Sequence, residues 1–420
     1  MGFQQGLSGL NASSKALDTL GNNIANSGTV GFKSSSTQFS DVFAASLGGG
    51  SQVGIGISVT SIAQQFGQGN VTATSNPLDL AINGQGFFRL NDNGTNTWTR
   101  NGQFNVDKSG YIVSNTGSRL TGYLANTASV IVPSTPADIF VNTADLQPQA
   151  TGNTGATGGV RMGFNLDSRA TTFGVAPPFS FTDPTTYTTS TSVSVYDTLG
   201  NPHLMSLFFR KGDGTAGLPA NTWQLYTSID GGVTIGTDAA GPTPVIFSGT
   251  GALTTPASGI VAQSLAVTTG ATSPLIYNLD LSGSTQFGNI FGVNSISQDG
   301  YTSGRLAGLS VSSDGTIQGR YSNGQTRDLA QVVLGNFSNP NGLSSLGNNQ
   351  WAETADSGQP LVGVPGSGSL GVLQSAAIEE SNVDLTAELV AMITQQRAYQ
   401  ANAQTIKTQD QILQTLVNLR

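Results

Sequence analysis

The part of the sequence that decides the fold is its last stretch, SNVDLTAELVAMITQQRAYQANAQTIKTQDQILQTLVNLR, at residues 381–420. Its apolar residues recur at alternating steps of four and three, which is the spacing of a helix face that packs against another helix. Residues 381–384 supply side chains that cap a helix start. We therefore expect a helix from about residue 385, with a packing seam formed by Leu385, Leu389, Met392, Tyr399, Ile406, Leu413 and Val417 and with Gln396, Ala403 and Asp410 in its other slots.

The beginning of the chain repeats this pattern. The spacing predicts a helix over about residues 3–26, stopped by Asn26-Ser27-Gly28. A long surface helix on a globular body is the alternative interpretation, but two seams at opposite ends of one chain favour a mutual partner. We expect the helices to pack against each other and against copies of the same protein, through Phe3, Leu7, Leu10, Leu17 and Ile24, with the small residues Ser14 and Gly21 between them.

Between the two helices the apolar period changes to about two, which is typical of β-strands. Asn83-Gly84, Asp314-Gly315 and Asn323-Gly324 lie between alternating apolar residues and predict hairpin turns. Val53, Ile55, Ile57 and Val59 predict a further extended strand. The 55 glycines and the charged fraction of only 10% also favour a β-rich chain.

These patterns predict a mainly β protein with terminal α-helices, arranged as a nested, elongated, multi-domain subunit. Residues 1–27 and 381–420 form the terminal helical domain, and 28–70 with 366–380 form a linker region with some extended structure. Residues 71–146 and 286–365 form a discontinuous β domain, into which an outer β domain is inserted at 147–285.

Composition excludes several classes of function. Lysine and arginine are scattered and the formal net charge is −8, which argues against nucleic acid as a partner. The chain has no cysteine, so disulfides, thiol catalysis and cysteine-bound metals are excluded. No apolar run approaches the roughly 18 residues of a spanning helix, and we expect no membrane insertion. The first residues lack the features of a secretory signal peptide, which predicts either a cytosolic protein or export without a cleaved signal.

Residues that could carry chemistry are better explained as structure. His203 is the only histidine and reads as a strand-edge residue. The Asp-Gly pairs lack the ligand spacing of calcium loops, and no helix follows Gly54-Ile55-Gly56 to cradle a phosphate. Glu379 and Glu380 are adjacent rather than paired across a cleft. We therefore expect no catalytic residue, cofactor or metal, and no enzyme.

The termini carry long motifs that resemble a known family. Residues 8–12, 20–27 and 30–33 (SGLNA, LGNNIANS and VGFK) closely resemble the N-terminal signature of bacterial flagellar rod and hook proteins. SNVDL at 381–385 and QQRAYQAN at 395–402 resemble the C-terminal signature. NPLDLAINGQGFF at 76–88 and TRNGQF at 99–104 look like the shared β domain, and VYDTLGNPH at 195–203 looks like the inserted domain of the hook branch.

The resemblance implies a structural subunit rather than an enzyme. It implies helical polymerisation into the hook, the curved, flexible tube that transmits torque from rod to filament, with export through the flagellar type III apparatus and an extracellular location in the flagellum. The implied partners are copies of itself, rod and hook–filament junction proteins, the hook cap and the export apparatus. The large inserted domain favours the hook branch over the shorter distal rod proteins. A β-rich surface adhesin and a secreted hydrolase are the alternatives from other classes, and the hydrolase lacks a recognisable nucleophile or carboxylate pair.

Overall fold

The structure is a computed structural model that describes residues 2–42, 54, 56–152, 158–174, 176–214, 219, 221–232 and 241–418. It divides the chain into two compact units. Met1–Thr143, Ala307–Arg320 and Thr326–Arg420 form the first unit, and Ala144–Leu306 with Tyr321–Gln325 form the second. Val53 and Ile55 of the predicted strand lie outside the described residues.

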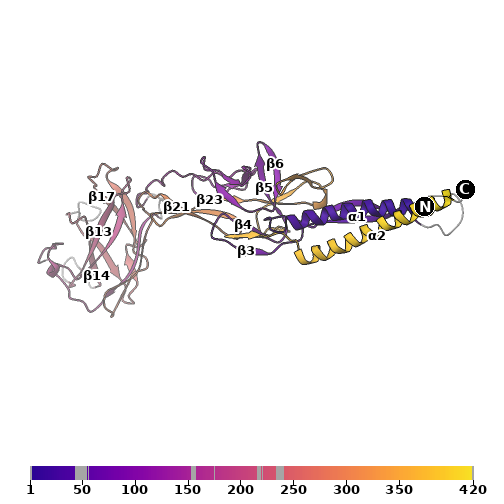
Figure 1. Ribbon diagram of the computed structural model, residues 1–420. Helices are drawn as coiled ribbons and strands as arrows, with labels where there is room; N and C mark the ends of the chain where they lie inside the picture. Colours follow the sequence, from indigo (N-terminus) through magenta and orange to yellow (C-terminus); the bar gives the residue numbers. More distant parts are fainter. Residues whose placement is uncertain are drawn as a thin grey trace. The chain divides into compact units, whose positions relative to one another are not determined.

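Two helices belong to the first unit and lie side by side (Figure 1). Asp384 caps the second helix, because its Oδ1 accepts hydrogen bonds from the backbone nitrogens of Thr386 and Ala387 at 2.9 and 3.1 Å. A mainly β chain with a helix at each end is confirmed. The helices are α1, Gly2–Ala25, and α2, Leu385–Asn418.

The segments predicted as a linker region with some extended structure carry strands that belong to the first unit. A hairpin of two antiparallel strands packs on α1, where Thr37 Oγ1 donates to Thr19 Oγ1 at 3.0 Å and Ile57 N donates to Ser8 Oγ at 3.3 Å. Two further strand pairs join early to late parts of the chain, which no local pattern shows. The hairpin is β1 (Ser35–Val42) and β2 (Gly56–Gln64), β3 (Val71–Ala73) pairs with β29 (Ala377–Glu379), and β4 (Leu80–Asn83) pairs with β28 (Val372–Ser375).

The body of the first unit is a 13-stranded sheet in which a central block of early strands is flanked on both sides by late strands. Its central path runs β21-β22-β23-β9-β5-β6-β26-β25. The strands are β5 (Phe87–Asp92), β6 (Thr95–Thr99), β7 (Phe104–Val106), β8 (Ile112–Ser114), β9 (Arg119–Leu124), β10 (Ala137–Asp138), β21 (Leu306–Val311), β22 (Thr316–Tyr321), β23 (Thr326–Val332), β24 (Leu334–Asn336), β25 (Ser344–Gly347), β26 (Gln350–Ala352) and β27 (Leu361–Gly363), and a 3-10 turn spans Pro340–Gly342.

An aromatic cluster forms part of the core of this sheet. The rings of Trp98 and Phe337 meet edge to face with centroids 5.1 Å apart, and Phe87 and Trp351 meet in the same way at 5.7 Å. Gly335 crosses directly over Trp98. A Cβ at position 335 would lie 2.1 Å from Trp98 Cζ3, so only glycine fits this crossing.

The second unit is a sandwich of two five-stranded sheets whose buried side chains form one core. Hydrogen bonds cross between the sheets, from Trp223 Nε1 to Gln286 Oε1 at 3.1 Å and from Thr227 Oγ1 to Gln263 Oε1 at 3.2 Å. One sheet holds β11 (Gly159–Asp167), β17 (Ile260–Leu265), β18 (Leu275–Asp280), β19 (Thr285–Phe287) and β20 (Gly292–Gln298). The other holds β12 (Thr189–Tyr196), β13 (Pro202–Lys211), β14 (Thr222–Ile229), β15 (Thr243–Phe247) and β16 (Leu253–Thr255), and a 3-10 turn spans Pro184–Thr186.

The edges of this unit differ from the predicted insertion at 147–285. Strands β19 and β20 both pair with β11, so the unit continues to Leu306. Asp314-Gly315 and Asn323-Gly324 form turns as predicted, since Gly315 N donates to Ser312 O at 2.9 Å and Gly324 N to Tyr321 O at 3.0 Å. Asn83-Gly84 does not close the predicted hairpin, because β4 pairs with β28 whereas β5 pairs with β6, β9 and β24. Among the described residues, no group of three His, Asp or Glu side chains is arranged to hold a metal ion. Nor does any helix in the described chain have the length and apolarity to cross a membrane.

His203 joins the two sheets of the second unit through carboxylates. Its Nδ1 lies 2.7 Å from Asp230 Oδ2 and its Nε2 lies 3.3 Å from Asp197 Oδ2, and Thr269, from the loop between β17 and β18 of the opposite sheet, donates to the same Asp197 oxygen at 2.6 Å. Burial of the imidazole opposes its charge, but the hydrogen bonds to Asp230 and Asp197 outweigh burial and raise the pKa of His203. His203 is therefore a buried link between two carboxylates rather than a plain strand-edge residue.

Replacing Gly335 with alanine should destabilise the first unit. The added methyl group overlaps Trp98, and forcing an atom into a packed core costs about 1–3 kcal/mol. Urea unfolding of the variant gives the change in free energy. Gly28→Ala is the control, because no atom lies within 4 Å of its new Cβ. Equal stabilities of the two variants would contradict the packing argument.

The second unit should lose stability as the solution becomes alkaline. Because the folded-state pKa of His203 is raised, its contribution is complete below the unfolded value of about 6.5 and is lost as pH rises through the folded value. His203→Gln should remove this pH dependence. Free energies of unfolding measured across the neutral and alkaline range test it, and an unchanged slope in the variant would refute the link.

Candidate functional site

The two helices meet through small side chains. The buried residues of α1 include Ala12, Ser13 and Ala16, and Gly9 and Gly6 lie about one and two turns before them. A Cβ added to Gly6 would lie 3.0 Å from Ile406 Cγ1, and one added to Gly9 would lie 2.7 Å from Asn402 Nδ2 of α2. The close approach of the helices therefore depends on residues with little or no side chain.

The predicted seam of α1 is not this contact face. Phe3 and Leu7 are 47% and 43% exposed, and Leu10, Leu17 and Ile24 are half-buried. The heptad spacing fits several faces of one helix, and in this chain the face with the smallest side chains turns toward α2. The rest of the chain therefore leaves Phe3 and Leu7 about half uncovered, and their role in subunit packing stays a prediction.

The predicted seam of α2 divides in the same way. Ile406 and Met392 are half-buried, whereas Leu385, Leu389, Tyr399 and Leu413 are exposed. Val417 lies within α2, and its side chain is outside the described part of the structure. The structure also exposes Val390, Ile393 and Ile412, which the seam pattern missed. Ile393 lies four residues after Leu389 and three after Val390, and this helical spacing was the available signal.

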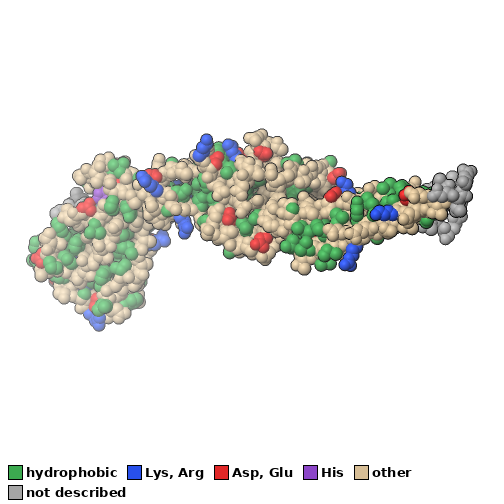
Figure 2. Space-filling model, in the orientation of Figure 1, with side chains coloured by type: hydrophobic (Ala, Val, Ile, Leu, Met, Phe, Trp, Pro, Cys, Tyr) green, Lys and Arg blue, Asp and Glu red, His purple; other side chains and the backbone are tan. Residues whose placement is uncertain are grey.

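Apolar side chains consequently lie at the surface of both helices, and Figure 2 shows them in green along the helical region. We call Phe3, Leu7, Leu389, Val390 and Ile393 the helix apolar surface. Val390 and Ile393 are 60% and 52% exposed. Covering a half-exposed side chain of this size contributes on the order of 1 kcal/mol. A few such residues supply enough free energy to hold a neighbouring molecule.

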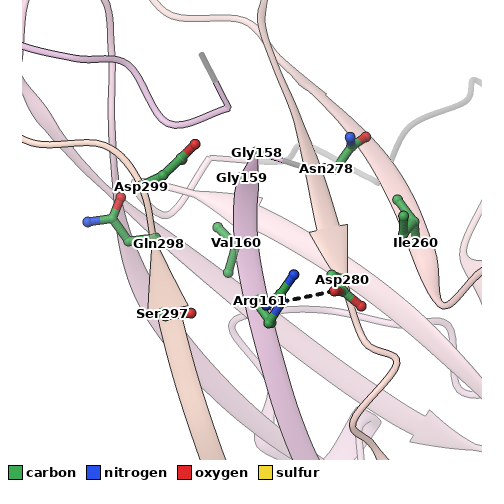
Figure 3. Close-up of a pocket in the computed structure, with 10 residues that line it drawn as sticks. All are labelled: Gly158, Gly159, Val160, Arg161, Ile260, Asn278, Asp280, Ser297, Gln298 and Asp299. Carbon is green, nitrogen blue, oxygen red and sulfur yellow. Dashed lines mark hydrogen bonds and ion pairs between the residues drawn. The ribbon is translucent and has the colours of Figure 1, made fainter. Parts of the chain in front are cut away.

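The cavities do not present a catalytic arrangement among the described residues. One cavity of about 310 Å³ in the second unit contains a single ion pair, Arg161 Nε to Asp280 Oδ2 at 3.1 Å, so these charges are already matched (Figure 3). Its ten lining residues include no histidine beside its one hydroxyl, Ser297. In the His203 cluster, the hydroxyl of Thr269 donates to Asp197 and not to the imidazole, which is not the order of a nucleophile and its base.

Four family models match successive parts of the chain. The "Flagella basal body rod protein" model matches residues 3–33, and the "Flagellar hook protein FlgE/F/G D1 domain" model matches 81–153. The "Flagellar basal body protein FlaE D2 domain" model matches 165–301, and the "Flagellar basal body rod FlgEFG protein C-terminal" model matches 374–419. The D2 match falls in the second unit, and the rod-protein matches fall on the two helices.

Curated relatives match along the whole chain. The flagellar hook protein FlgE of Salmonella typhimurium is 42% identical over 426 residues, covering 100% of both chains. The protein of the same name from Borreliella burgdorferi is 33% identical over 452 residues, covering 99% of this chain and 98% of the relative. A crystal structure of the Helicobacter pylori flagellar hook protein FlgE2 covers 73% of this chain and 100% of its own at 15% identity, with a TM-score of 0.50, and shows the shared fold.

The full-length identity and the order of the matched domains agree with the helices and sheets described above. The chain belongs to the flagellar hook protein FlgE family, whose members are structural proteins of the flagellar hook.

Proposed function

We propose that this chain polymerises into the wall of the hook through the helix apolar surface, with the helices lining the inner tube. The observation that carries the proposal is the exposure of large apolar side chains on helices that already contact each other through small ones. Exposed apolar residues that cluster mark sites of protein–protein contact, and Leu389, Val390 and Ile393 cluster within five residues of α2. The family is one that self-assembles, so a second copy of the chain is the natural partner.

The remaining surfaces suit a role outside this inner wall. The predicted domains of 71–146 with 286–365 and of 147–285 would form the outer layers of the tube, and their polar, glycine-rich strands favour weak contacts that can slide. Such contacts would let the tube bend while the helical wall stays closed. We propose that the rod, the hook–filament junction proteins and the hook cap contact this chain at the ends of the tube.

We also propose that the chain passes through the export apparatus without a cleaved signal peptide.

Polar replacement of the helix apolar surface should block polymerisation. In the double variant Leu389→Ser/Ile393→Ser, the lost apolar contacts should raise the critical concentration about 10- to 100-fold, since each 1.4 kcal/mol corresponds to a factor of ten. Sedimentation and electron microscopy of purified protein give this value. The control is Gln400→Ser/Gln404→Ser, which alters exposed polar residues at the same spacing on α2. Polymerisation of the first variant at the native concentration would refute the proposed interface.

Helix content should rise on assembly. A lone amphipathic helix whose apolar face meets water is only marginally stable, so residues 1–26 and 381–420 should be largely unfolded in the free chain and order in the tube. Circular dichroism before and after polymerisation measures this change. The same helix signal in both states would contradict coupled folding and assembly while leaving the contact face itself untouched.

A further inference from the structure

Glu379 is completely buried between two cations of the first unit. Its Oε1 accepts from Lys33 Nζ at 2.6 Å and from Gly69 N at 2.8 Å, and its Oε2 accepts from Arg100 Nη1 at 3.2 Å. The side chains of Lys33 and Glu379 are 0% exposed and that of Arg100 is 3% exposed. We call Lys33, Glu379 and Arg100 the buried ion cluster.

The cluster ties together four stretches of backbone that are distant in sequence. Lys33 Nζ also donates to Gly67 O at 2.7 Å, and Arg100 Nη2 donates to Gly84 O at 2.9 Å. The backbone oxygen of Glu379 accepts from Gly31 N at 2.8 Å. The chain leaving α1, the strand leading to α2 and the loops of the sheet therefore converge on one carboxylate.

Amide side chains complete this junction on the helical side. Asn382 Oδ1 accepts from Ser34 N at 2.8 Å while its Nδ2 donates to Gln65 O at 2.7 Å. Asn23 on α1 accepts from Ser35 N at 2.9 Å and donates to Glu388 Oε1 on α2 at 3.1 Å. The exit of α1 and the entry of α2 are thus bonded to the same few residues, and little backbone there is left to flex.

Because Lys33 and Arg100 are both buried cations, the junction depends on the carboxylate of Glu379. Burial lowers the pKa of Lys33 even though the attraction of Glu379 raises it, and the neighbouring Arg100 lowers this pKa further. Burial likewise lowers the pKa of Arg100. Without the carboxylate, two buried cations would face each other, and breaking one side of a buried ion pair is far more destabilising than losing a surface pair.

We propose that the buried ion cluster is the rigid joint that carries torque between the terminal helices and the sheet of the first unit. This inference rests on the proposed function, because it takes the helices to be the wall of the tube. The covalent connections from the helices and their hairpin to the sheet run through residues 26–35, 65–70 and 379–384. A fully bonded buried polar network holds such segments in one geometry, whereas loops in water would let the helices swivel. Lys33, Arg100 and Glu379 are thereby positioning residues of the subunit, and bending of the tube occurs elsewhere.

The test compares two full-length variants with native protein in assembled tubes. Lys33→Met removes one cation and leaves a matched Arg100–Glu379 pair, so the chain should still fold and polymerise. Glu379→Gln leaves both cations without their carboxylate and should have the larger effect. The control is Arg119→Met, which removes the cation of a pair with Asp138 in which Arg119 is 44% exposed. Hydrogen–deuterium exchange at Gly31, Ser34 and Gly69 and the persistence length of the tubes in electron micrographs are the two measurements.

We expect exchange at these amides to quicken at least about tenfold in Lys33→Met, together with a loss of persistence length. Arg119→Met should match the native tubes in both measurements. Native exchange rates and a native persistence length in tubes of Lys33→Met would overturn the proposed joint. A loss of persistence length in Arg119→Met equal to that in Lys33→Met would also overturn it. If native protein forms no tubes, the proposed function fails, and exchange at Gly31 and Gly69 in the free chain decides the joint by itself, because their partner Glu379 lies outside the residues expected to unfold there. Unchanged rates at these two amides in both cluster variants would overturn it.

Discussion

The carboxylate of Glu379 is the point on which the first unit depends. It lies out of water with Lys33 and Arg100, and it accepts hydrogen bonds from a side chain of the α1 exit, from a loop amide and from the sheet. A buried charge is tolerated only where several partners compensate it. Because these partners come from residues 33, 69 and 100, the cluster forms only when both ends of the chain are folded against the sheet. The strand pairs β3–β29 and β4–β28 join the same distant segments.

The two helices use small residues for contact with each other and leave larger apolar residues exposed, and a heptad pattern does not distinguish these two sets. Small residues bring α1 and α2 close together within one subunit, and the larger apolar residues remain at the surface. A subunit that buried all its large apolar side chains internally would keep little free energy for contact with its neighbours. Leaving them exposed makes the isolated helices marginal, which couples their stability to assembly.

The second unit follows a different plan, because its two sheets enclose their own core. Trp223, Phe209 and Phe164 are buried between the sheets, and the polar link of Asp197, His203, Asp230 and Thr269 closes one part of it. None of these residues belongs to the helix apolar surface. Its stability is therefore tied to internal packing and to the hydrogen bonds of one histidine, whereas in the proposed tube that of the helices would be tied to contact with other molecules.

By itself, the sequence determined the two helices, the caps and turns, and the β character of the region between them, because each rests on local spacing and on residues such as Asp384 and Gly315. The terminal motifs also determined the family. Only the tertiary structure decided which helix face turns inward, since heptad spacing leaves that to the sizes of the residues on the opposing helix. Glu379 shows the same limit. In the sequence it is one of two adjacent acids, and its role follows from Lys33 and Arg100, which are 346 and 279 residues away and reach it only in the folded chain.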